Sequence, residues 1–220
     1  MVTAISRLQS EMRSIVIFGT GDMGLLTCLS LREDARREIA GFTVERSYLT
    51  VKHFCDADVV PFDEVSIVYP SARHDMIIAV GPDKRNQLRP RLFAAAAALG
   101  YDFASYVHSS VRVHGSASVG RNCLIFENVV LQPHVQIGDN VMVRPLTYIG
   151  HHTRIESHCF VAPGVNLLGH CSLGEGAFIG AGVVVGPAVS IGAGSFVGAN
   201  ASVLKSLPAG SFVAPNSVIN

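Results

Sequence analysis

The sequence lacks the features that would point directly to a nucleic-acid-binding, membrane or disulfide-rich protein. It has five cysteines, an odd number with no Cys-x-x-Cys pair, which argues against a disulfide framework and against a cysteine-rich metal site. Seventeen Lys and Arg residues balance seventeen Asp and Glu residues. The chain therefore has no excess positive charge of the kind that binds nucleic acid or anionic lipid. We expect small molecules or other protein chains as partners, with no nucleic acid and no membrane.

Long apolar runs are also missing. The run Ile15–Phe18 is too short for a signal-peptide core or a membrane span, and Glu11 lies just before it. Together with thiols that show no pairing pattern, this composition predicts a cytoplasmic protein. The length of 220 residues allows one large domain or two small ones.

From about residue 105 onward the sequence repeats with a period of six. Val, Ile or Leu occupies every sixth position from Val107 to Val203, which makes seventeen repeats. An α-helix would spread such residues around its axis, whereas a period of six is typical of a parallel β-helix. Three repeats form one coil, so residues eighteen apart lie in register on neighbouring coils, about 4.8 Å apart. The repeats predict between five and six coils.

The first hundred residues lack this repeat and predict an α/β domain. Apolar stretches at 14–18, 39–44 and 75–80 are typical of strands. Helices are expected from the glycine-rich stretch 19–24 to about Arg37 and from Lys84 to Leu99. Strands that alternate with helices indicate a small parallel sheet. We therefore predict a Rossmann-like α/β domain at 1–104 and a β-helix at 105–220.

The stretch Gly-Thr-Gly-Asp-Met-Gly at 19–24 follows the first predicted strand and opens a helix. Such a Gly-x-Gly-x-x-Gly loop places backbone N–H groups and the positive end of a helix where a phosphate can bind. The same pattern also occurs in tight strand-to-helix turns, and the sequence leaves both interpretations open. The unit is too small for the two halves of a dinucleotide fold, so we expect a single nucleotide moiety and not NAD.

These features together resemble bacterial sugar acyltransferases of the NeuD and PglD type. The resemblance covers nearly the whole chain and depends on the glycine loop, on Ala79-Val-Gly-Pro-Asp-Lys-Arg, on Tyr106-Val-His-Ser-Ser and on the hexapeptide repeats. It implies a left-handed β-helix that forms a homotrimer, and an N-terminal domain that binds a nucleotide-linked aminosugar. It also implies acetyl-CoA as cosubstrate, in a groove between neighbouring subunits. The substrate-binding residues that it implies are Gly19, Gly21, Asp22, Met23 and Glu45.

The resemblance assigns the general base to a histidine two places after a repeat aliphatic, which is His151 here. A neutral imidazole with a pKa near 6.5 can take a proton from an attacking amine or hydroxyl at neutral pH. The family usually has an acidic residue next, where this chain has His152. Another group must then hold the ring, and the candidates are Glu156, Glu127 and a backbone carbonyl. We expect His151, His152 and Glu156 in the catalytic site.

Other family positions are matched less closely. The family has a second histidine at the position of Phe160, and His158 is nearby. The family also often has two acidic residues after the second strand, which recognise the nucleotide base. This chain has Glu45 and Arg46 there, so the identity of the base stays open. The resemblance places backbone contacts to the pantetheine arm of the cofactor, and glycines that keep the groove open, at positions where Gly and Ala also recur for structural reasons. These positions are Gly169, Gly180, Ala181, Gly198 and Ala199.

His134, His152 and His170 are eighteen residues apart and should form a ladder on three consecutive coils. Such a ladder could bind a metal ion, because imidazole is a common zinc ligand, or it could be a column of surface side chains. The γ-class carbonic anhydrases are hexapeptide-repeat trimers that bind zinc. In those enzymes a second histidine ligand follows five residues after the histidine of the Ile-Gly-His motif. This chain has Glu156 at that position, so this ligand is missing and we expect no metal.

Three functions fit this pattern. The first is an acetyl-CoA-dependent N-acetyltransferase that acts on the amino group of a nucleotide-linked amino-deoxy sugar. It would use direct attack, because the sequence has no nucleophile elbow and its repeat cysteines should point inward. The second is a sugar O-acetyltransferase acting on an acceptor such as a sialic acid. The third is a non-catalytic nucleotide-binding β-helix protein.

Overall fold

A computed structural model describes residues 13–82 and 86–220, so Glu11 and Lys84 lie outside the described residues. The described residues form two compact units. One comprises the chain up to Gly81 together with Arg91–Ser105, and the other comprises the described part of Pro82–Pro90 together with Tyr106–Asn220. Among the helices described, none combines the length and the apolar character needed to cross a membrane.

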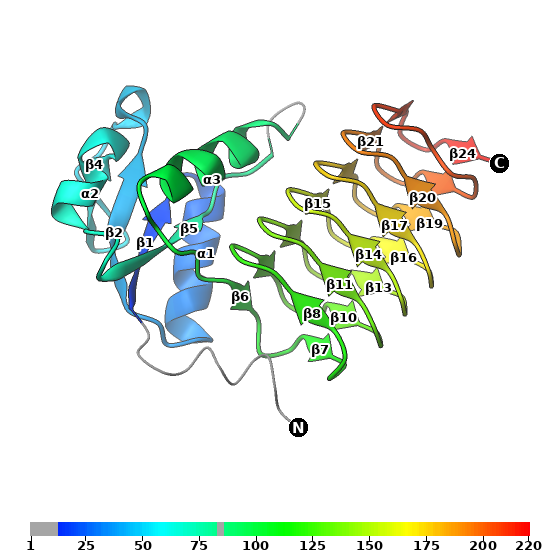
Figure 1. Ribbon diagram of the computed structural model, residues 1–220, viewed down its shortest axis with the longest axis horizontal. Helices are drawn as coiled ribbons and strands as arrows, with labels where there is room; N and C mark the ends of the chain where they lie inside the picture. The colour runs from blue at the N-terminus through cyan, green and yellow to red at the C-terminus, as the bar shows by residue number, and fades with distance from the viewer. Residues whose placement is uncertain (1–12, 83–85) are drawn as a thin grey trace. The chain divides into compact units, whose positions relative to one another are not determined.

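The first unit is built on a five-stranded sheet with the order β3-β4-β2-β1-β5 (Figure 1). Its strands are β1 (Ser14–Phe18), β2 (Ile39–Val44), β3 (His53–Phe54), β4 (Ala57–Pro61) and β5 (His74–Ile78). The helices are α1 (Asp22–Glu33), α2 (Val65–Val68) and the greater part of α3 (Leu88–Ala98), whose first three residues belong to the second unit. There are 3-10 turns at Arg46–Tyr48 and Phe62–Glu64. All pairings are parallel except that of β3 with β4.

The central strand β1 carries the core of this unit. Four of its five residues are buried, as expected for a parallel strand with neighbours on both sides. The strands predicted at 14–18 and 39–44 are confirmed, and the third covers His74–Ile78. The helix expected to reach Arg37 ends earlier, at Glu33, and Arg36 has a positive φ. The short β3–β4 hairpin and α2 were not predicted, because stretches of two to five residues carry little periodic signal.

The second unit is a parallel β-helix made of two-residue strands stacked in three sheets (Figure 1). The first sheet contains β6 (Tyr106–Val107), β9 (Leu124–Ile125), β12 (Met142–Val143), β15 (Phe160–Val161), β18 (Phe178–Ile179), β21 (Phe196–Val197) and β23 (Phe212–Val213). The second contains β7 (Arg112–Val113), β10 (Val130–Leu131), β13 (Tyr148–Ile149), β16 (Asn166–Leu167), β19 (Val184–Val185), β22 (Ser202–Val203) and β24 (Val218–Ile219). The third contains β8 (Ser118–Val119), β11 (Gln136–Ile137), β14 (Arg154–Ile155), β17 (Ser172–Leu173) and β20 (Ser190–Ile191).

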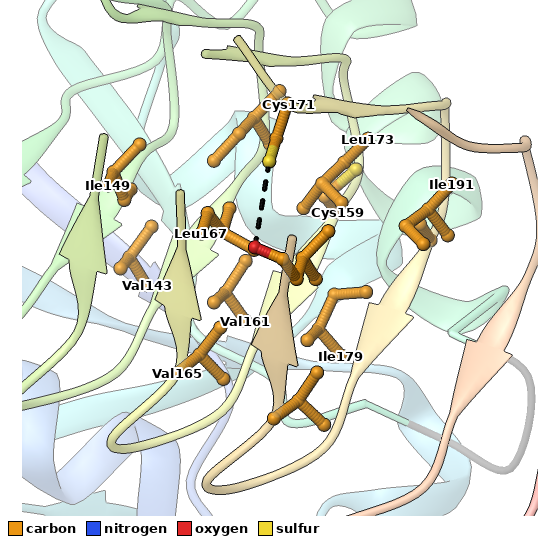
Figure 2. Packing of buried hydrophobic residues seen from close by; sticks show 14 of the residues in the cluster. Val143, Ile149, Cys159, Val161, Val165, Leu167, Cys171, Leu173, Ile179 and Ile191 are labelled. Carbon is orange, nitrogen blue, oxygen red and sulfur yellow. Dashed lines mark hydrogen bonds between the residues drawn. The ribbon is translucent and has the colours of Figure 1, made fainter. Parts of the chain in front are cut away.

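The predicted register is confirmed. Leu131 pairs with Ile149, and Ile149 pairs with Leu167, each eighteen residues further along the chain. The second residue of each strand points into the prism, where the aliphatic side chains form one continuous core (Figure 2). This core extends along the coils because each coil buries its aliphatics against the coils on either side.

The last coil differs from the others. Its partners are Ile191 with Leu207, Val197 with Val213, and Val203 with Ile219, each sixteen residues apart. The count of six-residue repeats ends at Val203, so it does not include this final coil, although the β-helix was predicted to extend to residue 220. Two residues are missing from the repeat here, but the inward aliphatics still meet.

The backbone conformation at the corners between the sheets restricts which residue types occur there. The third residue after each inward aliphatic has a positive φ at most corners. Glycine adopts this conformation freely, and Asn and His tolerate it better than most residues do. Four such positions are His134, His152, His158 and His170, with φ values between 59° and 66°. The histidine ladder thus has a local backbone cause as well as any functional one.

The three cysteines of the β-helix fill the core (Figure 2 labels Cys159 and Cys171). Their thiols donate hydrogen bonds to backbone carbonyls, such as that of Gly174 at 3.2 Å from Cys159 and that of Gly186 at 3.0 Å from Cys171. Burial raises the pKa of Cys123 and of Cys159 to about 12. These thiols are therefore protonated at neutral pH and unsuited to act as nucleophiles.

Candidate active site

The glycine loop lies at the carboxyl end of β1, between the ends of β2 and β5. Gly19 has a φ of 122°, and a Cβ atom there would lie 2.7 Å from the carbonyl oxygen of Ala79. A Cβ at Gly24 would overlap the carbonyl of Gly19. Both glycines are thus required by the turn itself. Gly21 differs, because nothing lies within 4 Å of a Cβ placed there, and this residue is the N-cap of α1.

This edge of the sheet is suited to a nucleotide. The chain passes from β1 to β2 on one side and reaches β5 on the other, and ligands of open α/β sheets bind where the strand order reverses in this way. The exposed Asp22 and the partly exposed Met23 begin α1, whose first N–H groups point toward this edge. Gly19 and Gly21 therefore lie in the loop, and Asp22 and Met23 lie in the first turn of α1 that follows it, at the same edge of the sheet.

Glu45 follows β2 at the same edge of the sheet. Its two carboxylate oxygens accept hydrogen bonds from Arg91 at 2.8 and 2.9 Å. This pairing lowers the pKa of Glu45, so the side chain is ionised at neutral pH. The neighbouring Arg46 is bound by Asp63 at 2.7 Å and by Glu64 at 2.6 Å. Both residues that follow β2 are thus held by partners within the first unit.

His151 lies in the second unit, at the corner between β13 and β14 that joins the second sheet to the third. Its imidazole is exposed and rests over the backbone of Gly169 on the next coil. A Cβ atom at 169 would lie 2.7 Å from both Cε1 and Nε2 of the ring. The absence of a side chain at Gly169 therefore provides the space that the His151 ring occupies.

The partner of His151 is its neighbour His152. The two Nδ1 atoms lie 3.2 Å apart, so one of them carries the proton of this contact and the other accepts it. Glu156 does not fill this role within one chain, because it lies at the next corner and pairs with Arg154 at 2.6 Å. Glu127 lies at the corner between β9 and β10, away from His151 in its own chain. Among the described residues of one chain, no contact supports the role expected for Glu156.

The predicted histidine ladder is present. The ring centroids of His134 and His152 are 4.7 Å apart, and those of His152 and His170 are 4.7 Å apart with an interplanar angle of 14°. The His151 ring stands nearly perpendicular to both His152 and His170. Partial desolvation, followed by the neighbouring histidines, lowers the pKa of His152. At neutral pH this imidazole is therefore neutral and can accept a hydrogen bond.

Three of these histidines have the geometry of a possible metal-binding group. Ring nitrogens of His151, His152 and His170 all lie within 4.8 Å of one another, and all three residues are exposed. The spacing of eighteen between the ladder histidines does not by itself predict this group of three, because His151 is not a member of the ladder and occupies a different position of the repeat. It requires the doublet at 151–152 together with the residue one coil above.

His158 takes part in a polar ladder at another corner. Its Nδ1 accepts a hydrogen bond from the amide of Asn140 at 2.8 Å, and the Asn122 amide donates to Asn140 at 2.7 Å. The guanidinium of Arg89, which is fully buried, donates to the Asn140 side chain at 2.7 Å. The Asn86 amide donates to the carbonyl of His158 at 2.6 Å. Sequence reasoning missed Arg89. The sequence signal for this polar ladder was the spacing of eighteen residues between Asn122, Asn140 and His158.

The polar ladder gives His158 a structural role. Burial lowers the pKa of His158, and the nearby Arg89 acts in the same direction. Phe160, where the family has a second histidine, stacks on Phe178 at 5.2 Å between ring centroids. Neither residue shares the corner of His151, so neither takes the place of the second family histidine within one chain.

The expected cofactor contacts fall at two different corners of one chain. Gly169 lies beside His151, whereas the other four lie at the corner between the first and second sheets. A Cβ at Gly180 would lie 2.6 Å from the nitrogen of Ala199, and one at Gly198 would lie 2.5 Å from the nitrogen of Pro215. These two glycines are thus explained by coil stacking. Ala181 is exposed and Ala199 is partly exposed, so both remain accessible to a ligand in the single chain.

Comparisons with known proteins agree with this architecture. Residues 116–151, 134–169, 152–187 and 170–205 each match the bacterial transferase hexapeptide family, whose model spans six repeats. A search of curated protein sequences gives no significant match.

Solved structures match over most of the chain. PerB from Caulobacter crescentus, in complex with CoA and GDP-perosamine, is 26% identical with a TM-score of 0.83, covering 92% of this chain and 94% of PerB. The acetyltransferase domain of PglB from Neisseria gonorrhoeae FA1090 is 23% identical with a TM-score of 0.82, covering 93% and 97%. WeeI from Acinetobacter baumannii AYE is 21% identical with a TM-score of 0.78, covering 92% and 97%. These matches confirm the predicted fold, an α/β unit followed by a left-handed β-helix.

Proposed function

We propose that this chain, a hexapeptide-repeat protein with the two-unit architecture of bacterial sugar acyltransferases, transfers an acetyl group from acetyl-CoA to the amino group of a nucleotide-linked amino-deoxy sugar. The observation that carries the proposal is the His151 imidazole, exposed at a β-helix corner and positioned by His152 and Gly169. It occurs in a chain that matches a CoA- and GDP-perosamine-bound protein over 92% of its length.

The contacts of His151 support its role as general base. When Nδ1–H of His151 donates to Nδ1 of the neutral His152, the lone pair of His151 is on Nε2. Nε2 then accepts a proton from the sugar amine as the amine attacks the thioester carbonyl, and the carbon–sulfur bond breaks to release CoA. The proton held by His151 can pass to the leaving thiolate. No protein nucleophile is needed, in agreement with the high pKa of the buried cysteines.

His152 takes the place of the acidic residue that usually follows the base. A carboxylate would both orient the ring and stabilise the imidazolium that forms, whereas a neutral imidazole can only orient it by accepting a hydrogen bond. His152 is therefore a positioning residue. The base in this chain should be less strongly assisted than one with an adjacent carboxylate.

We assign the nucleotide to the first unit. Backbone N–H groups of the loop at 19–24 and of the start of α1 would bind the phosphates. Gly21, with open space above it, allows the closest approach. Glu45, held in its ionised form by Arg91, lies at the same sheet edge, where it can accept hydrogen bonds from a base or ribose.

The active form in this proposal is a homotrimer in the cytoplasm. Gly169 lies at one corner of the prism, and Ala181 and Ala199 lie at another. A groove between two neighbouring subunits would place one corner of each subunit along the same pantetheine arm. Light scattering should then report the mass of three subunits, and a mass of one 23.4 kDa chain would contradict this part of the proposal.

The enzymatic proposal is tested by mixing the protein with acetyl-CoA and a panel of GDP-, UDP- and dTDP-linked sugars that carry a 3- or 4-amino group. Free thiol is followed with a chromogenic disulfide, and the product is identified by mass spectrometry. We expect thiol release that depends on the aminosugar, with the acetyl group on nitrogen. Faster acetylation of a hydroxyl-only sugar would instead indicate an O-acetyltransferase. Nucleotide binding without thiol release for any acceptor would indicate a non-catalytic protein.

A further inference from the structure

The three histidines at the corner of His151 have contacts that the acetyl-transfer reaction does not require. The reaction uses His151 and its neighbour His152. His170, one coil above His152, has its ring 5.0 Å from that of His151 and 4.7 Å from that of His152. All three side chains are exposed, and their ring nitrogens gather within 4.8 Å.

We infer that His151, His152 and His170 form a capture site for a divalent transition-metal ion that prefers imidazole ligands, with zinc as the representative, and that the bound ion inhibits the transfer reaction. The binding half of this inference stands on geometry alone. The inhibition half rests on the proposed function of His151.

The distances in the trio are close to those of a metal site. Zinc binds imidazole nitrogens at about 2.0–2.1 Å, so two nitrogens on a tetrahedral ion are about 3.3 Å apart. The Nδ1 atoms of His151 and His152 are already 3.2 Å apart. The farthest nitrogen in the trio is within 4.8 Å, so it must move by at most about 1.5 Å to reach the same spacing.

The surroundings of the trio allow this small movement. The side chains lie on the surface, so rotation about their side-chain bonds does not require repacking of the core. The backbones that carry His151 and His170 are fixed on adjacent coils, because His170 N–H donates to the carbonyl of His151 at 2.8 Å. The site is thus built from mobile rings on rigid supports.

The donor set also selects the class of ion. Three imidazoles without a carboxylate favour zinc, copper, nickel or cobalt over magnesium and calcium, which prefer oxygen ligands. Three protein ligands leave a fourth position of a tetrahedral ion open to water. An ion bound to Nδ1 of His151 would leave the ring proton on Nε2, the atom that otherwise accepts the substrate proton. Captured metal should therefore inhibit without unfolding the protein.

The test uses the full chain with any affinity tag removed and bound metal stripped with EDTA. Cobalt(II) is titrated while the visible absorption of the protein-bound ion is followed, and zinc is then added to displace it. We expect saturable binding of one cobalt per chain. His170→Asn, which suits the positive φ at this position, should weaken binding by about tenfold or more, a loss of about 1.4 kcal/mol. His134→Asn, a matched control in the same ladder but outside the trio, should change it by less than about threefold.

Activity measurements then separate the two halves of the inference. In the assay with EDTA, His170→Asn should turn over like the unsubstituted protein. Added zinc should inhibit the unsubstituted protein reversibly and His170→Asn much more weakly. Absence of saturable cobalt binding, or binding that His170→Asn does not weaken, would overturn the inference even if acetyl transfer is observed. Metal binding in a protein that transfers no acetyl group would leave the site in place and refute only the proposed function.

Discussion

The space above Gly169 gives the sharpest prediction about the active site. In Gly169→Ala, the new methyl group would lie 2.7 Å from Cε1 and Nε2 of His151. Ordinary carbon contacts are about 3.5–4.0 Å, so the ring must move by about 1 Å. The backbone at 169 does not have a positive φ, and alanine adds no backbone strain there. The exposed imidazole can move without disturbing the core.

A displacement of about 1 Å in a positioned catalytic group can lower the rate by about a hundredfold. We therefore expect the kcat of Gly169→Ala to fall by about that factor. The free energy of unfolding should change by less than about 1 kcal/mol, because the three atoms nearest the methyl group all belong to the exposed side chain of His151. The assay is thiol release at saturating acetyl-CoA and aminosugar, together with urea unfolding of the same samples.

The matched control is Gly115→Ala, at a β-helix corner where nothing lies within 4 Å of the added methyl group. This variant should retain both kcat and stability. Because Gly169 is also a proposed cofactor contact, the KM for acetyl-CoA is measured in parallel. A change confined to KM would assign Gly169 to cofactor binding alone. A kcat within about threefold of the unsubstituted value would refute the claim that the His151 position matters for catalysis.

Three further predictions follow from the contacts of the second unit. His152→Asn keeps a residue suited to the positive φ and a hydrogen-bond acceptor for His151, so its kcat should stay within about tenfold of the unsubstituted value. In His152→Ala the acceptor is lost, and kcat should fall by about a hundredfold. Equal losses in the two variants would contradict a positioning role. Arg89→Ala removes the buried guanidinium that donates to Asn140, and it should lower the free energy of unfolding in urea by about 2–4 kcal/mol. The control Arg121→Ala, at an exposed ion pair in the same unit, should lower it by less than about 1 kcal/mol. Similar losses in the two variants would show that the buried contact is unimportant. Because the pKa of His158 is lowered in the folded state, its contribution to stability is complete above the unfolded pKa of about 6.5 and is lost as the pH falls toward the folded value. The urea midpoint should therefore drop between about pH 7.5 and about pH 5.5, and it should drop less steeply in His158→Asn. An equal slope in the two proteins would contradict this assignment.

The repeat made the β-helix predictable in detail because each coil depends on local signals. An aliphatic at every sixth position fixes the inward face, and residues that accept a positive φ mark the corners. The same regularity made the ladder of His134, His152 and His170 predictable from spacing alone. It failed only where the spacing itself changed, in the final coil after Val203.

Features that depend on tertiary contacts could not be predicted. An arginine in a helical stretch suggests a surface residue, yet Arg89 is buried against Asn140 because the segment around it packs on the coils of its own unit. The partner of His151 was also open. The sequence left two glutamates and a backbone carbonyl as candidates, whereas in the structure His151 contacts His152. Glu156 is one corner away and is paired with Arg154. A repeat fixes the corner at which a side chain lies but not which polar neighbour it contacts.

The proposal depends above all on His151 as the base, and one measurement tests this most directly. Turnover of His151→Ala is compared with that of the unsubstituted protein, using acetyl-CoA and the aminosugar acceptor that the panel identifies, while CoA binding is measured by calorimetry. We predict that kcat falls by about 10²–10⁴-fold with CoA affinity nearly unchanged. Turnover equal to that of the unsubstituted protein would contradict the assignment of His151 and the acetyl-transfer mechanism built on it.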